Sequence, residues 1–475
     1  MARLEAAEAT IAEQAATIAE QAATIAEQAA TIVELGARLN QNSQNSSKPP
    51  SSDVPGTRPQ KEKRGKRRKR GGQPGHVGRF AAEPDHVDHV KQYRPSQCKH
   101  CRADLAAGKA TGSVVNHYVY ELPEIRPLVT DHQCLDVACP NCGLVTPATL
   151  PSDVPAGNYG PSVQAMVGFV RGELNQSMRQ TSDVMGKLFH VPMSAGMVAK
   201  TQDQVSQVLA APHHEAHEHA KRDDRAHADE TGWREDKKKA WLWVAVTSAV
   251  TVFLVHTRRN AKAAKALLGE TFAGILSTDR WASYNWVDAE HRQLCWSHLK
   301  RDFKKFLDYG SQAKRLGERL LAERRKLFRL WKKARDGTMT RVQLQLAARP
   351  VRRRILALLE EGKGVPSVKV CGMCREILKL RAALFTFIDV ERVAPTNNTA
   401  ERAIRFAVLK RKGCFGSDST KGSRFIERFL TVRANLRRQD RDLYAFLKQA
   451  CTAALHRTQA PSLLPATQGH PAAAA

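Results

Sequence analysis

The sequence predicts a multidomain protein whose core is a mixed α/β structure. Its 475 residues exceed what one hydrophobic core holds, since a domain averages roughly 150 residues. Residues 241–256 are rich in β-branched and aromatic side chains, which favours strands, and a helix-like segment and a further apolar strand follow them. Helical periodicity dominates before and after this region. The alternation predicts a sheet covered by helices and flanked by helical segments.

The first 40 residues repeat with a period of seven. The unit Thr-Ile-Ala-Glu-Gln-Ala-Ala begins at positions 10, 17 and 24, which is the coiled-coil period. The repeat aligns one apolar stripe of Leu4, Ile11, Ile18, Ile25, Ile32 and Leu39. The residues beside this stripe are alanines, so the apolar contact surface between two such helices would be small. We expect residues 1–40 to form a coiled-coil helix through which the protein forms a homo-oligomer; a solvated single helix is the alternative.

A polar and then strongly basic stretch follows the helix. Residues 40–53 are too polar to build a core, and eight of the ten residues at 61–70 are basic. We therefore predict that residues 41–85 form a disordered linker. Such a run binds the phosphate backbone without reading sequence, although a merely solvated tail is the alternative. The basic side chains assigned to this contact are Lys66, Arg67, Arg68, Lys69 and Arg70.

The charge of the whole chain agrees with a nucleic-acid partner. The net charge is +28 and the isoelectric point is about 10.0, the electrostatic footprint of a phosphate-binding protein. A membrane-surface protein could share this charge, but no apolar run approaches the roughly 20 residues that span a bilayer. The N-terminus lacks the pattern of a signal peptide. We expect a cytoplasmic, nucleoid-associated protein with no membrane contact.

Two Cys-x-x-Cys pairs predict a zinc-binding domain over residues 86–150. The pairs are Cys98-Lys-His-Cys101 and Cys139-Pro-Asn-Cys142, and four thiolates so arranged suit one structural Zn²⁺ in tetrahedral coordination. Their separation is longer than in compact fingers, so we expect a strand-containing insert between them. Unligated cysteines are the alternative, and Cys134 or His100 could replace one ligand. Cys371-Gly-Met-Cys374 has no partner pair, which disfavours a second zinc site.

Residues 158–212 have helical apolar spacing. We expect helices at 162–175 and 179–189, a break at Pro192, and a third helix capped by Ser194 that runs to about residue 209. Helix, short turn and capped helix is the outline of a DNA-binding helix-turn-helix, while an ordinary helical hairpin is the alternative.

The mixed core is predicted to begin at residue 222. We expect hairpin strands at Trp241–Thr247 and Val250–His256, a helix at 261–272, and a strand at 274–278 that returns parallel by a right-handed crossover. Residues 299–384 are almost entirely helical, and helices around Glu401 and over 423–438 follow. The predicted domains are a first core part at 222–309, a helical insertion at 310–392, a second core part at 393–456 and a disordered tail at 457–475.

Two acids stand where strand ends would place them in a cleft. Asp229 precedes the Trp-rich hairpin, Asp279 closes the strand after the crossover, and neighbouring strands would bring them together. Close carboxylates repel each other unless a cation intervenes, and Mg²⁺ prefers carboxylate oxygens. A surface turn is the alternative for each acid. Glu401 also fits a capping box at the start of a helix, and spacing alone does not choose it over Glu391 or Glu427.

A set of motifs decides between these readings. The motifs are Asp229-Glu-Thr-Gly-Trp233, Cys295-Trp-Ser-His-Leu-Lys-Arg301, Asn397-Asn-Thr-Ala-Glu-Arg-Ala-Ile-Arg405, Lys410-Arg-Lys412, Gly416-Ser-Asp-Ser-Thr-Lys-Gly422, and the upstream Asn42–Asp53 and Gly71–His76 stretches. In this order they resemble the DDE transposases of the insertion-sequence-66 family, over about residues 33–455.

The resemblance implies an RNase H-like core with a helical insertion between the second and third acids. It makes Asp229, Asp279 and Glu401 a catalytic triad that holds two Mg²⁺ or Mn²⁺ ions. The implied activity is metal-dependent cleavage of the ends of an insertion sequence and their transfer to target DNA, with accessory proteins of the same element as further partners. A structure-specific nuclease and an inactive DNA-binding regulator or remnant are the alternatives.

Some residues in the matching motifs carry expectations of their own. We expect the basic residues around the third acid to contact DNA, and His298 to pack or to contact phosphate. Arg280 stands where a glycine is expected and Phe406 where a proline is usual, which leaves an inactive copy as an alternative. The basic residues assigned to DNA are Arg405, Lys410, Arg411 and Lys412.

Overall fold

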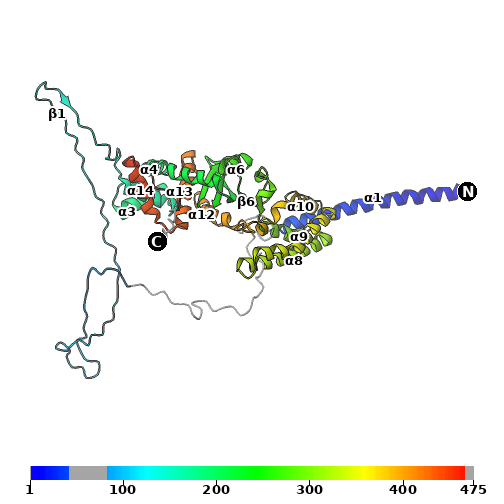
Figure 1. The fold of residues 1–475 in the computed structure, drawn as a ribbon, viewed down its shortest axis with the longest axis horizontal. Coiled ribbons are helices and arrows are strands. Elements are labelled where there is room, and N and C mark those ends of the chain that lie inside the picture. The colour runs from blue at the N-terminus through cyan, green and yellow to red at the C-terminus, as the bar shows by residue number, and fades with distance from the viewer. Residues whose placement is uncertain (1, 42–82, 466–475) are drawn as a thin grey trace, which may run out of the picture. The chain divides into compact units, whose positions relative to one another are not determined.

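The computed structural model describes residues 2–41 and 83–465 (Figure 1). The chain divides into two compact units, one formed by residues 54–126 and the other by 1–53 together with 127–475. The basic run Lys66–Arg70 lies outside the described residues, so its DNA contact stays a prediction. No helix within the described ranges is both long and apolar enough to cross a membrane.

The described residues of the smaller unit, 83–126, contain a hydrogen-bonded turn at the first cysteine pair and a second one at 105–108. An isolated bridge between Gln97 and Asp104 closes the turn around the first cysteine pair. In the larger unit, β1 (Val137–Ala138) and β2 (Val145–Thr146) form an antiparallel pair around the second cysteine pair. The predicted strand-containing insert between the two pairs contains β1 at its end, while residues 105–136 form no strand.

The N-terminal heptads form one long helix, α1 (Ala2–Leu39). Its apolar stripe is open to solvent: Ile11, Ile18 and Ile25 are each at least 64% exposed. At the C-terminal end of the helix, Ala37 is buried in the core of the helical insertion and Glu34 pairs with Lys369 Nζ. The helix prediction is thus confirmed, while its association remains a prediction.

The helical segment before the sheet has the predicted outline. It contains α2 (Pro161–Gly172), α3 (Met178–Phe189), α4 (Ala195–Val208) and α5 (Ala210–Arg222). Ser194 caps α4 by accepting a hydrogen bond from the Met197 amide at 3.2 Å, as expected. α3 ends before Pro192, because His190 adopts the left-handed conformation with φ of 52°. The histidine-rich α5 was not predicted, and it extends this helical segment from the expected residue 212 to residue 222.

A five-stranded mixed sheet forms the centre of the larger unit. Its spatial order is β5-β4-β3-β6-β7, in which β3, β4 and β5 are antiparallel and β6 and β7 run parallel to β3. The predicted hairpin and the parallel return after the helix are confirmed, while β7 was not predicted. The strands are β3 (Arg225–Glu235), β4 (Lys238–Thr247), β5 (Thr251–His256), β6 (Ile275–Thr278) and β7 (Arg292–Leu294).

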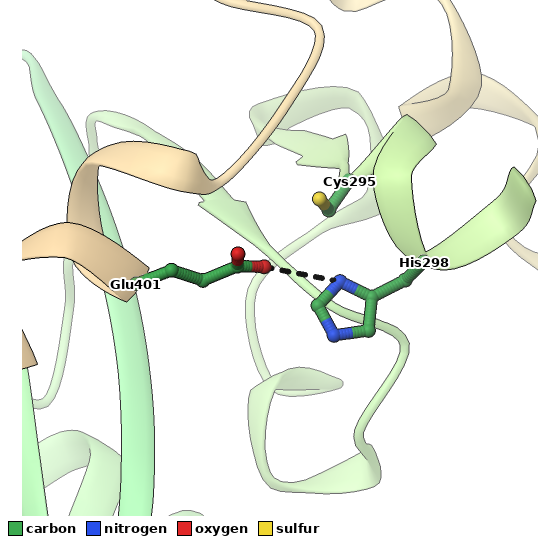
Figure 2. Close-up of side chains that lie close together, drawn as sticks. All are labelled: Cys295, His298 and Glu401. Atoms are coloured by element: carbon green, nitrogen blue, oxygen red, sulfur yellow. Dashed lines mark ion pairs between the residues drawn. The ribbon is translucent and has the colours of Figure 1, made fainter. Parts of the chain in front are cut away.

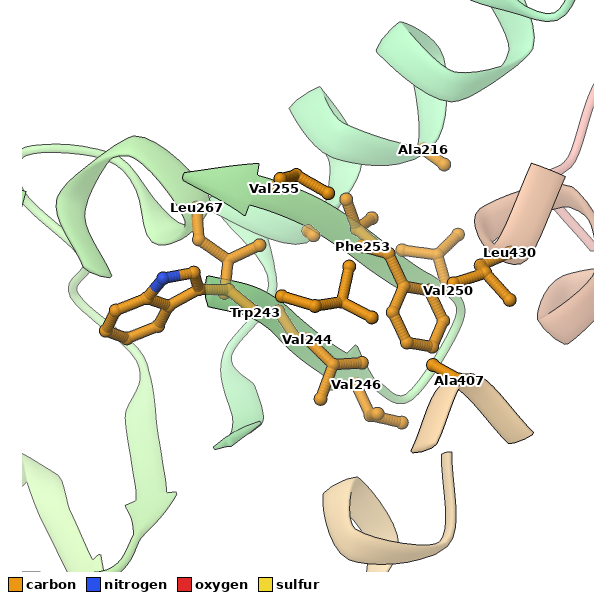
Figure 3. Packing of buried hydrophobic residues seen from close by; sticks show 14 of the residues in the cluster. Ala216, Trp243, Val244, Val246, Val250, Phe253, Val255, Leu267, Ala407 and Leu430 are labelled. Carbon is orange, nitrogen blue, oxygen red and sulfur yellow. The ribbon is translucent and has the colours of Figure 1, made fainter. Parts of the chain in front are cut away.

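Helices from four parts of the chain surround the hairpin strands (Figure 3). Figure 3 shows side chains of β4 and β5 packed among Ala216 of α5, Leu267 of α6, Ala407 of α12 and Leu430 of α13. The crossover helix is shorter than expected because Gly269, with φ of 91°, ends it. The covering helices are α6 (Ala261–Leu268), α12 (Asn398–Cys414) and α13 (Thr420–Arg438), and α14 (Leu443–Leu455) packs on α2.

Helix α13 caps the open edge of the sheet with side chains. Glu427, Thr431 and Asn435 accept hydrogen bonds from the amides of Val255, Phe253 and Thr251 at 3.0, 2.9 and 2.8 Å. Four helical residues rise about 6 Å and two strand residues about 6.6 Å, so the two spacings match. The β5 edge is thereby closed to pairing with another strand. Glu427 therefore has a structural role, which removes it as an alternative to Glu401 for the third acid.

The predicted helical insertion has a hydrophobic core of its own. Trp296, Phe303 and Phe387 are fully buried in this core. Its helices are α7 (Trp296–Lys305), α8 (Gly310–Arg335), α9 (Arg341–Glu361), α10 (Val368–Lys379) and α11 (Thr386–Asp389). The insertion lies between β7 and α12, and therefore between the second and third acids in the chain.

The prediction of a disordered tail is wrong for residues 457–465, which the structure describes. Leu463 is fully buried in the sheet core, and its carbonyl accepts a hydrogen bond from Gln439 Nε2 at 2.8 Å. Leu464 also packs against this core, and the Pro- and Ala-rich composition of the segment concealed both contacts. Residues 466–475 lie outside the described part of the chain.

The pairing of α5 with β5 makes stability depend on pH. His213 Nε2 donates to the Phe253 carbonyl at 3.0 Å, and burial lowers the pKa of His213 from 6.5 to about 4. The unfolded chain therefore binds a proton that the folded chain does not, and stability falls as the pH drops from about 6.5 towards 4. We expect a loss of roughly 2 kcal/mol by pH 5.

Urea unfolding at pH 7 and pH 5 measures this effect. His213→Gln should show a smaller acid-induced loss, although His217, whose pKa burial also lowers, keeps part of it. The control is His214→Gln, because His214 is the exposed neighbour on the same helix. Equal acid sensitivity of wild type and His213→Gln would contradict the assignment.

Candidate active site

The strand register places Asp229 and Asp279 side by side. β3 and β6 are parallel neighbours with His227 opposite Ser277, and two further residues along each strand lead to Asp229 and Asp279. Asp229 lies within β3, while Asp279 directly follows β6. The two acids are thus neighbours as predicted, although Asp229 lies inside β3 and not at the strand end that the sequence suggested.

Each of these carboxylates is held by one backbone amide. Asp229 Oδ1 accepts from the Glu230 amide and Asp279 Oδ1 from the Trp281 amide, both at 2.9 Å. Buried Arg292 holds the backbone of the second acid, since its guanidinium donates to the Asp279 carbonyl at 3.3 Å. The side chains are thus oriented while their second oxygens make no hydrogen bond within the described residues.

Glu401 reaches the same region from the first turn of α12. The cap of this helix is Asn397, whose side chain makes no capping hydrogen bond, so the capping-box alternative does not apply. Instead, Asn397 Nδ2 donates to the Ala228 carbonyl at 2.7 Å, and its Oδ1 lies 3.2 Å from His227 Nδ1. One buried amide therefore fastens the start of α12 to β3 beside Asp229.

The acids influence one another electrostatically. Burial raises the pKa of Asp229 well above its usual value, and the negative charges of Glu230, Asp279 and Glu401 raise it further. Burial and Asp279 likewise raise the pKa of Glu230. Such mutual repulsion is relieved by a proton or a cation, so the cluster is suited to binding positive charge.

The sequence did not single out Glu230. Its side chain is only 2% exposed, and it accepts hydrogen bonds from Tyr284 Oη at 2.6 Å and Arg259 Nε at 2.8 Å. The Arg259 guanidinium also stacks on the rings of Trp241 and Trp281, 4.8 and 4.0 Å from their centroids. Glu230 is therefore paired with Arg259 and hydrogen-bonded to Tyr284, and it forms a wall of the site together with them.

Both departures from the family pattern have partners. Arg280 pairs with Asp302 at 2.7 Å, so the larger side chain is directed to α7. Phe406 lies under the Arg433 guanidinium, 3.4 Å from the ring centroid, and Arg433 pairs with Glu173. Neither substitution displaces an acid.

Glu401 also faces two residues at the start of α7. Figure 2 shows its carboxylate directed towards the His298 ring, with the Cys295 sulfur above both. The distance from His298 Nδ1 to Glu401 Oε1 is 3.7 Å. One ligand atom from each of the three residues lies within 4.8 Å of the other two, and no other described trio of His, Cys, Asp or Glu meets this limit.

A comparison with family models matches residues 156–424 to the Transposase IS66 family. The match covers more than half of the 475 residues. The chain belongs to the IS66 transposase family. Residues 2–81 match a second model, a family of unknown function (DUF6444). A comparison with curated proteins gives no match. All three acids lie within the IS66 match, which begins just before α2.

Two of the expected DNA contacts on the α12 helix of this IS66 transposase family member are open to solvent. Arg405 and Lys412 are exposed, while Arg411 is partly buried and donates to Thr231 Oγ1 at 2.9 Å. A concave surface lies where this end of α12 meets β3. It is lined by Gly232, Trp233, Arg234, Arg411, Lys412 and Phe415.

Lys410 has a different environment from its neighbours. It is buried, and its ammonium donates to the Arg171 carbonyl at 2.9 Å and to Asn175 Oδ1 at 2.8 Å. Burial lowers its pKa to about 8. The expected DNA contact is corrected for Lys410, because these bonds join α12 to the end of α2 and leave no ammonium group exposed.

The two cysteine pairs fold into turns of the same design. The Cys98 amide donates to the carbonyl five residues later, and its carbonyl accepts from the amide four residues later; Cys139 repeats both bonds. The fourth residue after each first cysteine has positive φ, 58° for Arg102 and 73° for Gly143. Each turn belongs to a different unit of the chain, so each is a separate local structure.

Proposed function

We propose that this IS66-family member is a DDE-type transposase that binds the ends of an insertion sequence, cleaves them and joins them to target DNA. The observation that carries the proposal is the β3–β6 register, which sets Asp229 beside Asp279, with Glu401 within electrostatic reach. The five-stranded mixed sheet, with a helical insertion between the second and third acids, supports an RNase H-like core.

The residues of the chain prepare the site for a phosphodiester. Asp229 and Asp279 each use one oxygen to accept an amide, which leaves the other to bind a cation. The donor set fits Mg²⁺ or Mn²⁺, since hard divalent ions prefer carboxylate oxygens. Two such ions, when bound, supply charge stabilisation to both the attacking and the leaving oxygen of an in-line displacement. Arg259 and Arg292 add positive charge at the walls.

The test is an assay of purified full-length protein on DNA from the ends of the encoding element. We expect Mg²⁺- or Mn²⁺-dependent cleavage that leaves 3′-hydroxyl ends, followed by joining of these ends to a target duplex. Cleavage without joining would favour a structure-specific nuclease. Specific binding without metal-dependent cleavage would overturn the proposal in favour of an inactive regulator.

We further propose that the thiolates of Cys98, Cys101, Cys139 and Cys142 hold one structural Zn²⁺ that shapes a DNA-gripping module. Support comes from the two matching turns, each of which presents a Cys-x-x-Cys pair in the same backbone geometry. Tetrahedral coordination by four thiolates is a closed structural site.

The zinc proposal predicts a metal content of one zinc per chain from this module. Cys98→Ser and Cys142→Ser should each lose it and weaken binding to DNA ends, as measured by elemental analysis and gel shift. Cys414→Ser is the control, because Cys414 is an exposed cysteine on α12. Unchanged zinc content in both Cys98→Ser and Cys142→Ser would contradict the proposal.

We also propose that the exposed stripe of α1 binds the same stripe of a second copy. Burying isoleucines on both helices would remove apolar surface from water. Ile18→Asp with Ile25→Asp should shift the protein to monomer in light scattering. The matched control is Ala16→Asp with Ala23→Asp, which adds the same charge on the opposite face. Identical masses for the two double variants would refute the stripe as the interface.

The DNA-binding surfaces of the proposal are the α3–α4 hairpin, the basic linker and the exposed basic side chains of α12. Arg405 and Lys412 are exposed and form no ion pair with any other described residue, and exposed Phe415 lines the same concave surface as Lys412. Contacts of this kind go mainly to phosphates, so they position the protein without reading bases.

A further inference from the structure

The geometry points to a second kind of metal site, for a transition-metal ion such as Zn²⁺ or Co²⁺, formed by Cys295 Sγ, His298 Nδ1 and a Glu401 carboxylate oxygen. These three atoms lie within 4.8 Å of one another (Figure 2). The inference shares Glu401 with the proposed function, but it requires neither DNA nor cleavage. It can therefore be tested independently of catalysis.

Two polar atoms of this cluster are buried without a hydrogen-bond partner. They are His298 Nδ1 and Glu401 Oε1, which are 3.7 Å apart. This separation is too long for a hydrogen bond. Buried polar atoms are rarely left unsatisfied in folded proteins, and an ion bound between them is one established reason.

The backbone supplies the ligands from two rigid elements. Cys295 is the N-terminal cap of α7, and His298 lies three residues later, on the same side of the helix. Glu401 faces them from α12. The Cys295 sulfur already accepts a hydrogen bond from the Asn397 amide at 3.1 Å, an interaction that orients a ligand and stabilises a thiolate.

The separations suit tetrahedral coordination. Ligand atoms about 2.0–2.3 Å from one tetrahedral ion lie roughly 3.4–3.7 Å from each other. The His298–Glu401 pair is at this spacing, and the sulfur needs to move by about 1 Å at most. On binding, the Cys295 thiol releases its proton to solvent and forms the metal–sulfur bond.

The donor atoms select the class of metal. A thiolate and an imidazole suit borderline ions such as Zn²⁺ and Co²⁺, whereas Mg²⁺ prefers oxygen alone. Three protein ligands leave a fourth position open to water or to a substrate oxygen. The site thus differs in chemistry from the Asp229–Asp279 pair and from the four-thiolate module.

Cobalt titration of the full-length protein tests the inference, because a tetrahedral Co²⁺–thiolate site gives charge-transfer and d–d absorption. Cys295→Ala leaves the four cysteines of the two Cys-x-x-Cys pairs intact, so the difference in Co²⁺ binding between this variant and wild type reports this site alone. We expect one fewer Co²⁺ per chain and a loss of charge-transfer intensity. Cys451→Ala is the matched control, since Cys451 is a buried cysteine on α14. Identical Co²⁺ binding by wild type and Cys295→Ala overturns the inference.

Two further variants protect the test against a folding defect in Cys295→Ala. His298→Gln and Glu401→Gln keep the sulfur and its hydrogen bond, and each should weaken Co²⁺ binding by about 10-fold or more without lowering the unfolding temperature. Unaltered affinity in both overturns the site. If the wild type cleaves DNA with Mg²⁺ but binds Co²⁺ no differently from Cys295→Ala, the inferred transition-metal site is wrong and the proposed function stands. If the wild type binds one more Co²⁺ than Cys295→Ala but does not cleave DNA, the proposed function is wrong and the inferred metal site stands.

Discussion

Asp229→Asn and Asp279→Asn are each expected to reduce metal-dependent strand cleavage by about 10³-fold or more while leaving the binding of DNA ends intact. Each substitution keeps the shape of the side chain and removes the charge that holds a cation. Metal ions at such sites contribute several kcal/mol to transition-state stabilisation, and each 1.36 kcal/mol corresponds to about tenfold in rate. Single-turnover cleavage and a gel shift with the same DNA measure the two effects.

The same substitutions carry a stability signature. The pKa of Asp229 is raised by burial and by three neighbouring acids, so a neutral amide at this position relieves repulsion. We expect Asp229→Asn to unfold at a higher temperature than wild type when no divalent ion is present. The control is Asp224→Asn, because Asp224 is an exposed acid before the same strand. Cleavage at the wild-type rate by Asp279→Asn, or a less stable Asp229→Asn protein, would contradict the site.

Asn397→Ala is expected to have the second-largest effect. The substitution leaves the Ala228 carbonyl without its donor and frees the start of α12 from β3, so Glu401 is no longer held beside Asp229. We expect a loss of about 1–3 kcal/mol of stability and a fall of about 10–100-fold in cleavage and in Mn²⁺ affinity.

The Mn²⁺ affinity separates a positioning role from a merely structural one. A variant that is only less stable would bind Mn²⁺ normally below its unfolding temperature. Asn398→Ala is the control, since Asn398 is the exposed next residue, with only a long 3.4 Å contact to Ser297 Oγ. Equal Mn²⁺ affinity in Asn397→Ala and Asn398→Ala would refute the positioning role.

Local patterns in the sequence predicted much of the core. The β-branched runs of β4 and β5, the crossover helix and the Ser194 cap depend on neighbouring residues, so the sequence pattern revealed them. β7 was missed because it is three residues long and contains Arg292 and Gln293. These polar residues are buried only because distant groups satisfy them: Thr278 Oγ1 accepts from Arg292, and Gln293 Oε1 accepts from the Phe387 amide.

The residues of the candidate site also divide into those that the sequence predicted and those that it did not. Asp279 follows a strand as predicted, and Asp229 was predicted beside it although it lies inside β3. Glu401 was identified only through the flanking motif that resembles the family. The roles of Glu230 and Asn397 depend on partners far away in the chain, since Glu230 meets Tyr284 and Asn397 meets Ala228. No local spacing encodes such contacts. The adjacent acids at 229 and 230 were the only sequence signal for Glu230.

The most direct test of the central claim is a Mn²⁺ titration of the full-length protein, followed by electron paramagnetic resonance. The claim is that Asp229, Asp279 and Glu401 together hold divalent cations for DNA cleavage. Wild type should bind Mn²⁺ at this site, and a double variant with Asp229→Asn and Asp279→Asn should lose that binding while Asp224→Asn retains it. Equal Mn²⁺ binding by wild type and the double variant would contradict the claim.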